Sequence, residues 1–186
     1  MIVPVLDQEP GVWPKDLFEV RLRTGEVAPW FVCHVRARAE KAVARRLRGR
    51  GIGYFLPQHV RGKRFQRRLV RSHLPLFPGY IFVVGNEEDH ARTVELTQVV
   101  RVLGIEDQTQ IDRELRDIDR LLQSGMPVTR EERLRPGALA RVIHGPLTGL
   151  CGRVLHNRKG LRLVLEVQFL QRGVSIEVDS TAIEAV

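Results

Sequence analysis

The chain has 186 residues, of which 43% are hydrophobic and 28% are charged, and it carries a formal net charge of +8 at pH 7. These values are typical of a globular protein with one domain or two small ones, with enough apolar residues to form cores. No apolar run approaches the roughly 20 residues that a membrane-spanning helix needs, and the first ten residues lack the features of a cleavable signal. We therefore expect a cytoplasmic protein with no membrane partner.

The cysteines and histidines indicate neither a metal site nor a catalytic site. Cys33 and Cys151 lie far apart with no CxxC or Cys-His spacing, and the six histidines form no ligand pair. There is no nucleophile motif and no phosphate-binding loop. The sequence thus predicts a binding protein rather than an enzyme, with no metal and no cofactor.

The positive charge is concentrated in one segment. From Trp30 to His73 there are 13 Lys or Arg residues and one acid, Glu40, a local net charge of +12 that leaves −4 for the rest of the chain. Such a block favours a polyanionic partner, most often nucleic acid, although many of these side chains could simply be solvated.

In chain order, residues 1–29 contain four prolines without a sustained period and predict an irregular leader, with a short strand near Phe18–Leu22. Residues 30–35 (WFVCHV) predict a strand. Residues 39–50 place an apolar stripe on a helix whose other faces are basic.

Residues 54–71 then predict a strand and a basic hairpin. Lys and Arg residues with Phe65 near the tip suit contact with a phosphate backbone. A solvated hairpin is the alternative.

The stretch LPLFPGYIFVV at 74–84 predicts a central strand with apolar side chains on both faces. Tyr80 and Phe82 share one face, and Ile81 and Val83 share the other. Paired aromatics are more often core than contact surface. If Ile81 and Val83 fill the core, Tyr80 and Phe82 remain free for contact.

Beyond this strand, the pattern predicts a polar break at 85–89, a short helix near 91–96, a strand that ends at Gly104, and a helix from Gln108 to Gln123. Carboxylates on the last helix alternate with arginines, which favours a salt-bridged surface over a metal cluster. A polar stretch follows, and then short strands divided by turns suggest a small barrel.

The order of helix, basic hairpin, FPGY strand, short helix and VVRVLG strand resembles the N-terminal (NGN) domain of the NusG family of transcription elongation factors. The run ARVIHGPLTGLCGRVL resembles the KOW motif, with Gly145, Pro146 and Gly152 at its hallmark positions. The resemblance implies an α+β fold, with an antiparallel sheet flanked by helices followed by a five-stranded KOW β-barrel. The expected domains are a leader (1–29), an NGN domain (30–124), a linker (125–134) and a KOW domain (135–186).

The resemblance also implies partners for the NGN domain, which in this family docks on the clamp helices of RNA polymerase and touches its gate loop. The positions that match the clamp contact are His34, Phe77, Tyr80 and Phe82. The positions that match the gate-loop contact are His90, Arg92 and Thr93. In RfaH-like members the basic helix also reads the non-template DNA strand, and the matching positions and their neighbours are Arg36, Arg38, Lys41, Arg45 and Arg46.

For the KOW domain, the resemblance implies ribosomal protein NusE or the termination factor Rho as partners. The matching apolar rim is Leu147, Leu150, Phe169 and Leu170, each of which could instead be buried in the barrel. The expected protein is a monomeric elongation and antitermination factor that couples transcription to translation, and its compact length and basic bias favour a specialised RfaH-like paralogue that acts at specific operons. A KOW-type RNA-binding or ribosome-associated protein is the alternative.

Overall fold

The computed structural model describes residues 9–24, 28–65, 68–131, 137–157 and 160–186. The first eight residues of the predicted leader lie outside this description, as do residues 132–136, where the predicted linker meets the predicted barrel domain. The chain divides into two compact units, Met1–Gly104 and Ile105–Val186.

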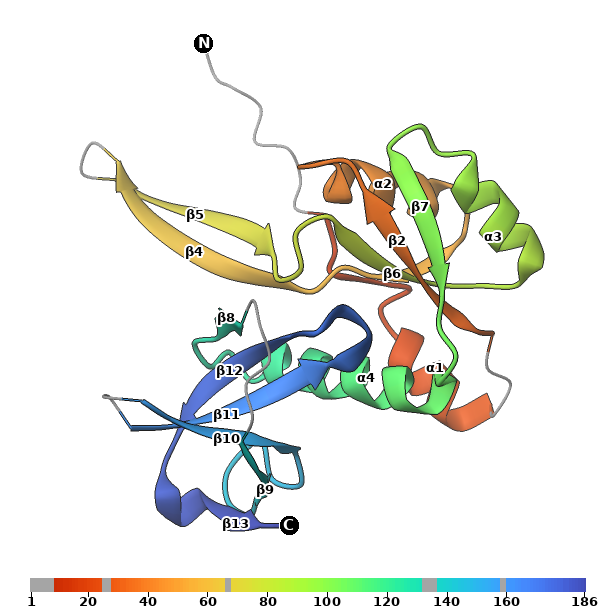
Figure 1. Ribbon diagram of the computed structural model, residues 1–186. Helices are drawn as coiled ribbons and strands as arrows, with labels where there is room; N and C mark the ends of the chain where they lie inside the picture. The colour runs from red at the N-terminus through yellow and green to blue at the C-terminus, as the bar shows by residue number, and fades with distance from the viewer. Residues whose placement is uncertain (1–8, 25–27, 66–67, 132–136, 158–159) are drawn as a thin grey trace. The chain divides into compact units, whose positions relative to one another are not determined.

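The N-terminal unit is built on a five-stranded antiparallel sheet (Figure 1). Its spatial order is β1-β3-β6-β2-β7, so the FPGY strand β6 lies in the middle of the sheet, as its two-sided apolar pattern predicts. The bounds are β1 Val12–Trp13, β2 Trp30–Val35, β3 Gly53–Phe55, β6 Tyr80–Val84 and β7 Val99–Gly104.

One face of this sheet packs against the basic helix α2 (Glu40–Gly49). The helix contributes the apolar stripe Val43, Ala44 and Leu47, and each of these side chains is fully buried. The residues that meet this stripe in one core include Cys33 from β2 and Ile81 and Val83 from β6. This result confirms the predicted parity, because Ile81 and Val83 fill the core under α2 while Tyr80 and Phe82 lie on the opposite face.

The opposite face of the sheet carries aromatic side chains, and residues of the predicted leader (1–29) pack against it. Residues 18–22 were expected to form a strand, but they belong to a helix, α1 (Leu17–Thr24). The Phe18 ring on this helix lies 5.1 Å from the Phe55 ring, edge to face, and 5.9 Å from the Trp30 ring. The strand prediction was wrong because the apolar residues of this short segment suit either structure, and packing on the sheet decides between them.

The predicted hairpin is present as a two-stranded antiparallel ribbon, β4 (Gln58–Phe65) and β5 (Arg68–Pro75). Figure 1 draws the ribbon extending away from the five-stranded sheet. Its side chains at positions 61–71 lie outside the description, so the predicted phosphate contact stays a prediction.

The short helix after β6 begins earlier than expected. α3 spans Glu87–Val94, not 91–96, and much of the predicted polar break is helical. Asn86 caps it: its side chain accepts the Asp89 N–H, and the Asp89 side chain accepts the Asn86 N–H in return. The prediction overlooked this reciprocal capping box.

The C-terminal unit holds a six-stranded antiparallel sheet in the order β13-β9-β10-β11-β12-β8. The small β-structure agrees with the prediction, but it contains one strand more than the expected five among the described residues. The extra strand is β8 (Thr129–Glu131), which pairs with β12 from within the predicted linker. The other strands are β9 Ala138–Val142, β10 Cys151–Asn157, β11 Gly160–Val167, β12 Arg172–Val178 and β13 Ile183–Ala185, with short 3-10 turns at Gln168–Leu170 and Ser180–Ala182.

Helix α4 spans Gln108–Gln123, the range that the sequence predicts. Its buried stripe is Ile111, Leu115, Ile118 and Leu121, and the neighbouring Leu122 is only partly buried. Arg116 pairs with Asp112 one turn earlier, as expected of a salt-bridged helix face. Because α4 contacts β11, the compact unit begins at Ile105, whereas the predicted boundary lies in the linker at 125–134. Within the described residues, no helix is long and apolar enough to cross a membrane.

Candidate functional site

A pair of stacked rings lies at one end of the aromatic face of the N-terminal unit. His34 in β2 and Tyr80 in β6 are direct partners in the antiparallel register. Their rings lie 5.2 Å apart, centroid to centroid, with an interplanar angle of 28°. Both side chains are half-buried, so they form a ring pair that a partner can contact.

The turn before Tyr80 holds this ring pair in place. Gly79 has a φ of +84°, a backbone conformation that favours glycine. Its N–H donates to Oε1 of Glu40 at 2.7 Å, and its carbonyl accepts the N–H of Val35 at 2.8 Å. Glu40 is 5% exposed and lies in the first turn of α2, where a carboxylate is favoured by the helix dipole. The single acid of the basic block therefore joins α2 to the FPGY turn.

Replacing Glu40 with alanine is expected to lower the free energy of unfolding of the N-terminal unit by about 1.5–3 kcal/mol, because the partly buried Gly79 N–H loses a charged acceptor. Glu40→Gln retains an acceptor oxygen and is expected to lose less than half of that. Denaturant unfolding followed by tryptophan fluorescence measures both variants, since Trp13 and Trp30 both belong to this unit. Equal losses in the two variants would contradict the assigned role of the oxygen.

Two of the four residues predicted for the polymerase clamp are buried. Phe77 is 1% exposed and Phe82 is 0% exposed, and their rings meet edge to face at 5.9 Å. Phe82 also lies 6.4 Å from the Phe55 ring. Phe82 thus follows the core alternative, and Phe77 is buried beside it. Of this set, His34 and Tyr80 are the accessible members, and their contact with the clamp stays a prediction.

The residues predicted for the gate loop lie on α3 in different environments. His90 is exposed and its ring lies 5.1 Å from the Phe31 ring. Thr93 is 0% exposed, and its hydroxyl donates to the Asp89 carbonyl at 2.7 Å, so it is removed from the predicted surface. Arg92 is partly buried, and its guanidinium donates to the Arg50 carbonyl at 2.9 Å, which joins α3 to the end of α2.

The basic helix α2 and the loop before it carry the cationic side chains that are predicted to bind nucleic acid. Arg36, Arg38 and Arg46 are exposed, and Lys41 is partly exposed. Arg38 has a φ of +63°, which is uncommon for a residue with a Cβ.

Arg45 was grouped with these residues by position, but it has an acidic partner. Its Nε lies 3.1 Å from Oε2 of Glu9, and Arg48 Nη2 lies 3.4 Å from Oε1 of the same carboxylate. The segment from Glu9 to Gly11 lies beside these arginines and is held there by hydrogen bonds from Gln58 and Leu56.

In the C-terminal unit, two of the four predicted rim residues are buried and two are accessible. Leu147 and Leu150 are 3% and 1% exposed, so both are core residues and not rim residues. Phe169 is 41% exposed, and Leu170 beside it is partly exposed; both lie in the turn after β11.

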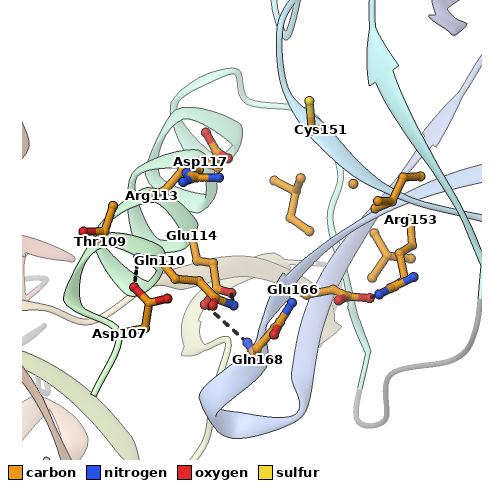
Figure 2. Close-up of a pocket in the computed structure, with 14 residues that line it drawn as sticks. Asp107, Thr109, Gln110, Arg113, Glu114, Asp117, Cys151, Arg153, Glu166 and Gln168 are labelled. Atoms are coloured by element: carbon orange, nitrogen blue, oxygen red, sulfur yellow. Dashed lines mark hydrogen bonds and ion pairs between the residues drawn. The ribbon is translucent and has the colours of Figure 1, made fainter. Parts of the chain in front are cut away.

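A pocket of about 450 Å³, lined by both polar and apolar side chains, lies between α4 and the strands β10 and β11 of this unit (Figure 2). Glu114 accepts the N–H of Gln168 at 3.2 Å and the side-chain amide of Gln110 at 2.8 Å, while Arg153 pairs with Glu166 at 2.9 Å. Burial raises the pKa of the Glu114 carboxyl above its usual value. These pairings occupy several charged groups of the pocket, so the pocket belongs to the packing of α4 on the sheet.

Sequence reasoning missed three residues that shape these surfaces: Glu9, Glu40 and Arg48. Glu40 had a detectable signal, because a lone acid in a basic block stands out. Glu9 had none, because it lies in a proline-containing stretch and its arginine partners are 36 and 39 positions away.

A family model described as "Transcription termination factor nusG" matches residues 28–122, which are 95 of the 186 residues. A solved structure described as "Domain interaction in Thermotoga maritima NusG" has 21% identity and a TM-score of 0.46, and the match covers 85% of this chain and 97% of that one. Another, described as "Crystal Structure of MjSpt4:Spt5 complex conformation B", has 15% identity and a TM-score of 0.28, with 84% and 96% covered. No curated protein matches the chain.

Proposed function

This chain belongs to the NusG family of transcription factors, and on that premise we propose that it is an elongation factor that binds bacterial RNA polymerase and suppresses pausing or termination. The observation that supports this proposal most directly is the ring pair of His34 and Tyr80. It lies at one of the positions that correspond to the clamp contact of the family, and both rings are accessible.

The ring pair suits a helical partner for physical reasons. Two stacked rings offer a rigid, amphipathic surface that loses little conformational entropy on binding, and such aromatic groups dominate many interfaces. The bond between Glu40 and Gly79 fixes the turn beneath Tyr80 before the partner arrives. The clamp helices of the polymerase are therefore the proposed partner of this surface, with the exposed His90 on α3 as the proposed contact to the gate loop.

The basic helix gives the proposal its second part. Arg36, Arg38, Lys41 and Arg46 are the proposed contacts to the exposed non-template DNA strand. Each arginine or lysine near a phosphate releases counterions, so the contact adds affinity that depends on salt. Selective action at particular operons, in the manner of an RfaH-like antitermination paralogue, would follow from base contacts in addition to these charges.

The exposed turn of the C-terminal unit gives the third part. Phe169 and Leu170 are the proposed contacts to ribosomal protein NusE or to Rho. Binding of NusE by this unit while the N-terminal unit holds the polymerase would couple transcription to translation.

The test is a pull-down of bacterial RNA polymerase with the wild type and with His34→Ala plus Tyr80→Ala. We expect the double variant to lose binding by at least tenfold, because truncation of central aromatic contacts at interfaces commonly costs about 2 kcal/mol or more. Val94→Ala is the control, since Val94 is 53% exposed on α3 of the same unit and is expected to bind like the wild type.

Two results would oppose the proposal. Polymerase binding by the folded double variant at the wild-type level would remove the ring pair from the interface. A wild type that binds ribosomal RNA tightly and does not bind polymerase would favour the RNA-binding alternative.

A further inference from the structure

A buried carboxylate lies against the basic helix and comes from outside the segment that matches the family. Glu9 is 2% exposed, and both of its carboxylate oxygens face guanidinium groups of α2, at 3.1 Å from Arg45 and 3.4 Å from Arg48. The family match begins at residue 28. The two arginine side chains are 50% and 41% exposed, so they lie at the surface of α2 although their partner is buried.

The chain around Glu9 is held by hydrogen bonds to the sheet. The Tyr54 hydroxyl donates to Glu9 Oε1 at 3.3 Å, and the Gln58 side-chain amide donates to the Glu9 carbonyl at 3.0 Å. The N–H of Leu56 donates to the Gly11 carbonyl at 2.6 Å, and β1 then pairs with β3. Glu9 is thus delivered to α2 by an ordered segment, and its local concentration at the two arginines is high.

The chemistry of this contact resembles that of a phosphate contact. A carboxylate and a phosphate both accept charge-assisted hydrogen bonds from guanidinium groups, and they compete for the same donors. Arg46, between the two paired arginines in sequence, is exposed, and its guanidinium donates to the neutral Thr97 hydroxyl at 3.5 Å, the limit for a hydrogen bond.

We propose that Glu9 withdraws Arg45 and Arg48 from nucleic acid, so that the polyanion-binding surface of α2 is limited to Arg36, Arg38, Lys41 and Arg46. The inference rests on the proposed function of α2 as a DNA-binding helix. Glu9 thereby reduces the affinity that depends on charge alone and leaves relatively more of the binding to contacts that distinguish sequences.

The closing experiment compares two neighbouring arginines with the same probe. Binding of a fluorescein-labelled single-stranded DNA oligonucleotide of mixed sequence is measured by anisotropy over a range of salt concentrations. For a single strand log K falls as log salt rises, and the salt slope, taken as the magnitude of that fall per unit of log salt, grows by about 0.7 for each phosphate neutralised. Arg46→Gln is expected to lower the slope by about 0.7, whereas Arg45→Gln is expected to leave it unchanged, because Arg45 is held by Glu9.

The converse variant frees the two arginines. Glu9→Gln is expected to raise the slope by about 1.4, so that the variant loses roughly sevenfold more affinity than the wild type between about 50 and 200 mM salt. Glu19→Gln is the matched control, since it removes an exposed carboxylate from α1 and makes the same change in net charge. Amide exchange at Leu56 reports whether the segment stays on the sheet in the Glu9 variant.

The outcomes separate the two levels of the proposal. Equal loss of slope in Arg45→Gln and Arg46→Gln would overturn the role of Glu9 and keep α2 as the DNA-binding helix, and this comparison does not require the Glu9 variant to fold. Equal behaviour of folded Glu9→Gln and Glu19→Gln would overturn it as well. Absence of DNA binding in every protein, wild type included, would overturn both the proposed function of α2 and the role of Glu9.

Discussion

Phe82→Ala is expected to lower the free energy of unfolding of the N-terminal unit by about 3–5 kcal/mol, the range for removing a fully buried aromatic ring. Phe82 is 0% exposed and lies on the central strand, where it pairs with Val32 on one side and Phe55 on the other. Its ring contacts those of Phe55 and Phe77. Denaturant unfolding followed by the fluorescence of Trp13 and Trp30 measures the loss.

The same strand provides the control. Tyr80 lies two residues before Phe82 on the same face, but it is only half-buried. Tyr80→Ala is therefore expected to cost about 1 kcal/mol of stability and to weaken polymerase binding. A Phe82 variant of nearly wild-type stability that no longer binds polymerase would restore Phe82 to the docking surface.

Gly152→Ala is expected to disrupt the C-terminal sheet, with a loss of about 3 kcal/mol in its free energy of unfolding. A Cβ at this position would lie 2.4 Å from the carbonyl oxygen of Val164 and 3.1 Å from its carbonyl carbon. These are backbone atoms of the adjacent strand β11, and they cannot move away without breaking the ladder between β10 and β11. Amide exchange in β10 and β11 should accelerate, and the tryptophan unfolding transition of the other unit should not change.

Gly104→Ala is the matched substitution. A Cβ at Gly104 meets no atom within 4 Å, so its effect is expected to stay within about 0.5 kcal/mol. Unchanged amide protection in the Gly152 variant would mean that β10 and β11 can separate to admit a methyl group, contrary to the tight packing described here.

The helices and strands in which apolar residues recur with a clear period were predictable from the sequence. The pattern of α4 gave both of its ends, and the two-sided apolar pattern of β6 gave its central place in the sheet. Short segments were less certain. The run from Leu17 suits a helix or a strand, and only its packing on Trp30 and Phe55 distinguishes the two.

Strand alternation predicted which face of the sheet each residue of the candidate site lies on, but it did not predict which of these residues are buried. Alternation placed Tyr80 and Phe82 on the face opposite Ile81 and Val83, and that assignment is confirmed. Alternation does not predict that Phe82 is buried whereas Tyr80 is partly exposed. Both side chains lie on the same face of one strand, and their exposure differs only because other segments of the chain cover Phe82 more fully. The buried Thr93 on α3 and the buried Leu147 between β9 and β10 illustrate the same limit.

The sequence by itself determined the class of this protein: an α+β chain of the NusG family, whose longer and strongly periodic elements follow from local periodicity and whose positive charge lies in one block. The tertiary structure decided which of those charges and rings are available to a partner. Glu9 reaches Arg45 across 36 positions, and Glu40 reaches Gly79 across 39. Such pairings arise from the way the backbone folds back on itself, and no local pattern of residues encodes them.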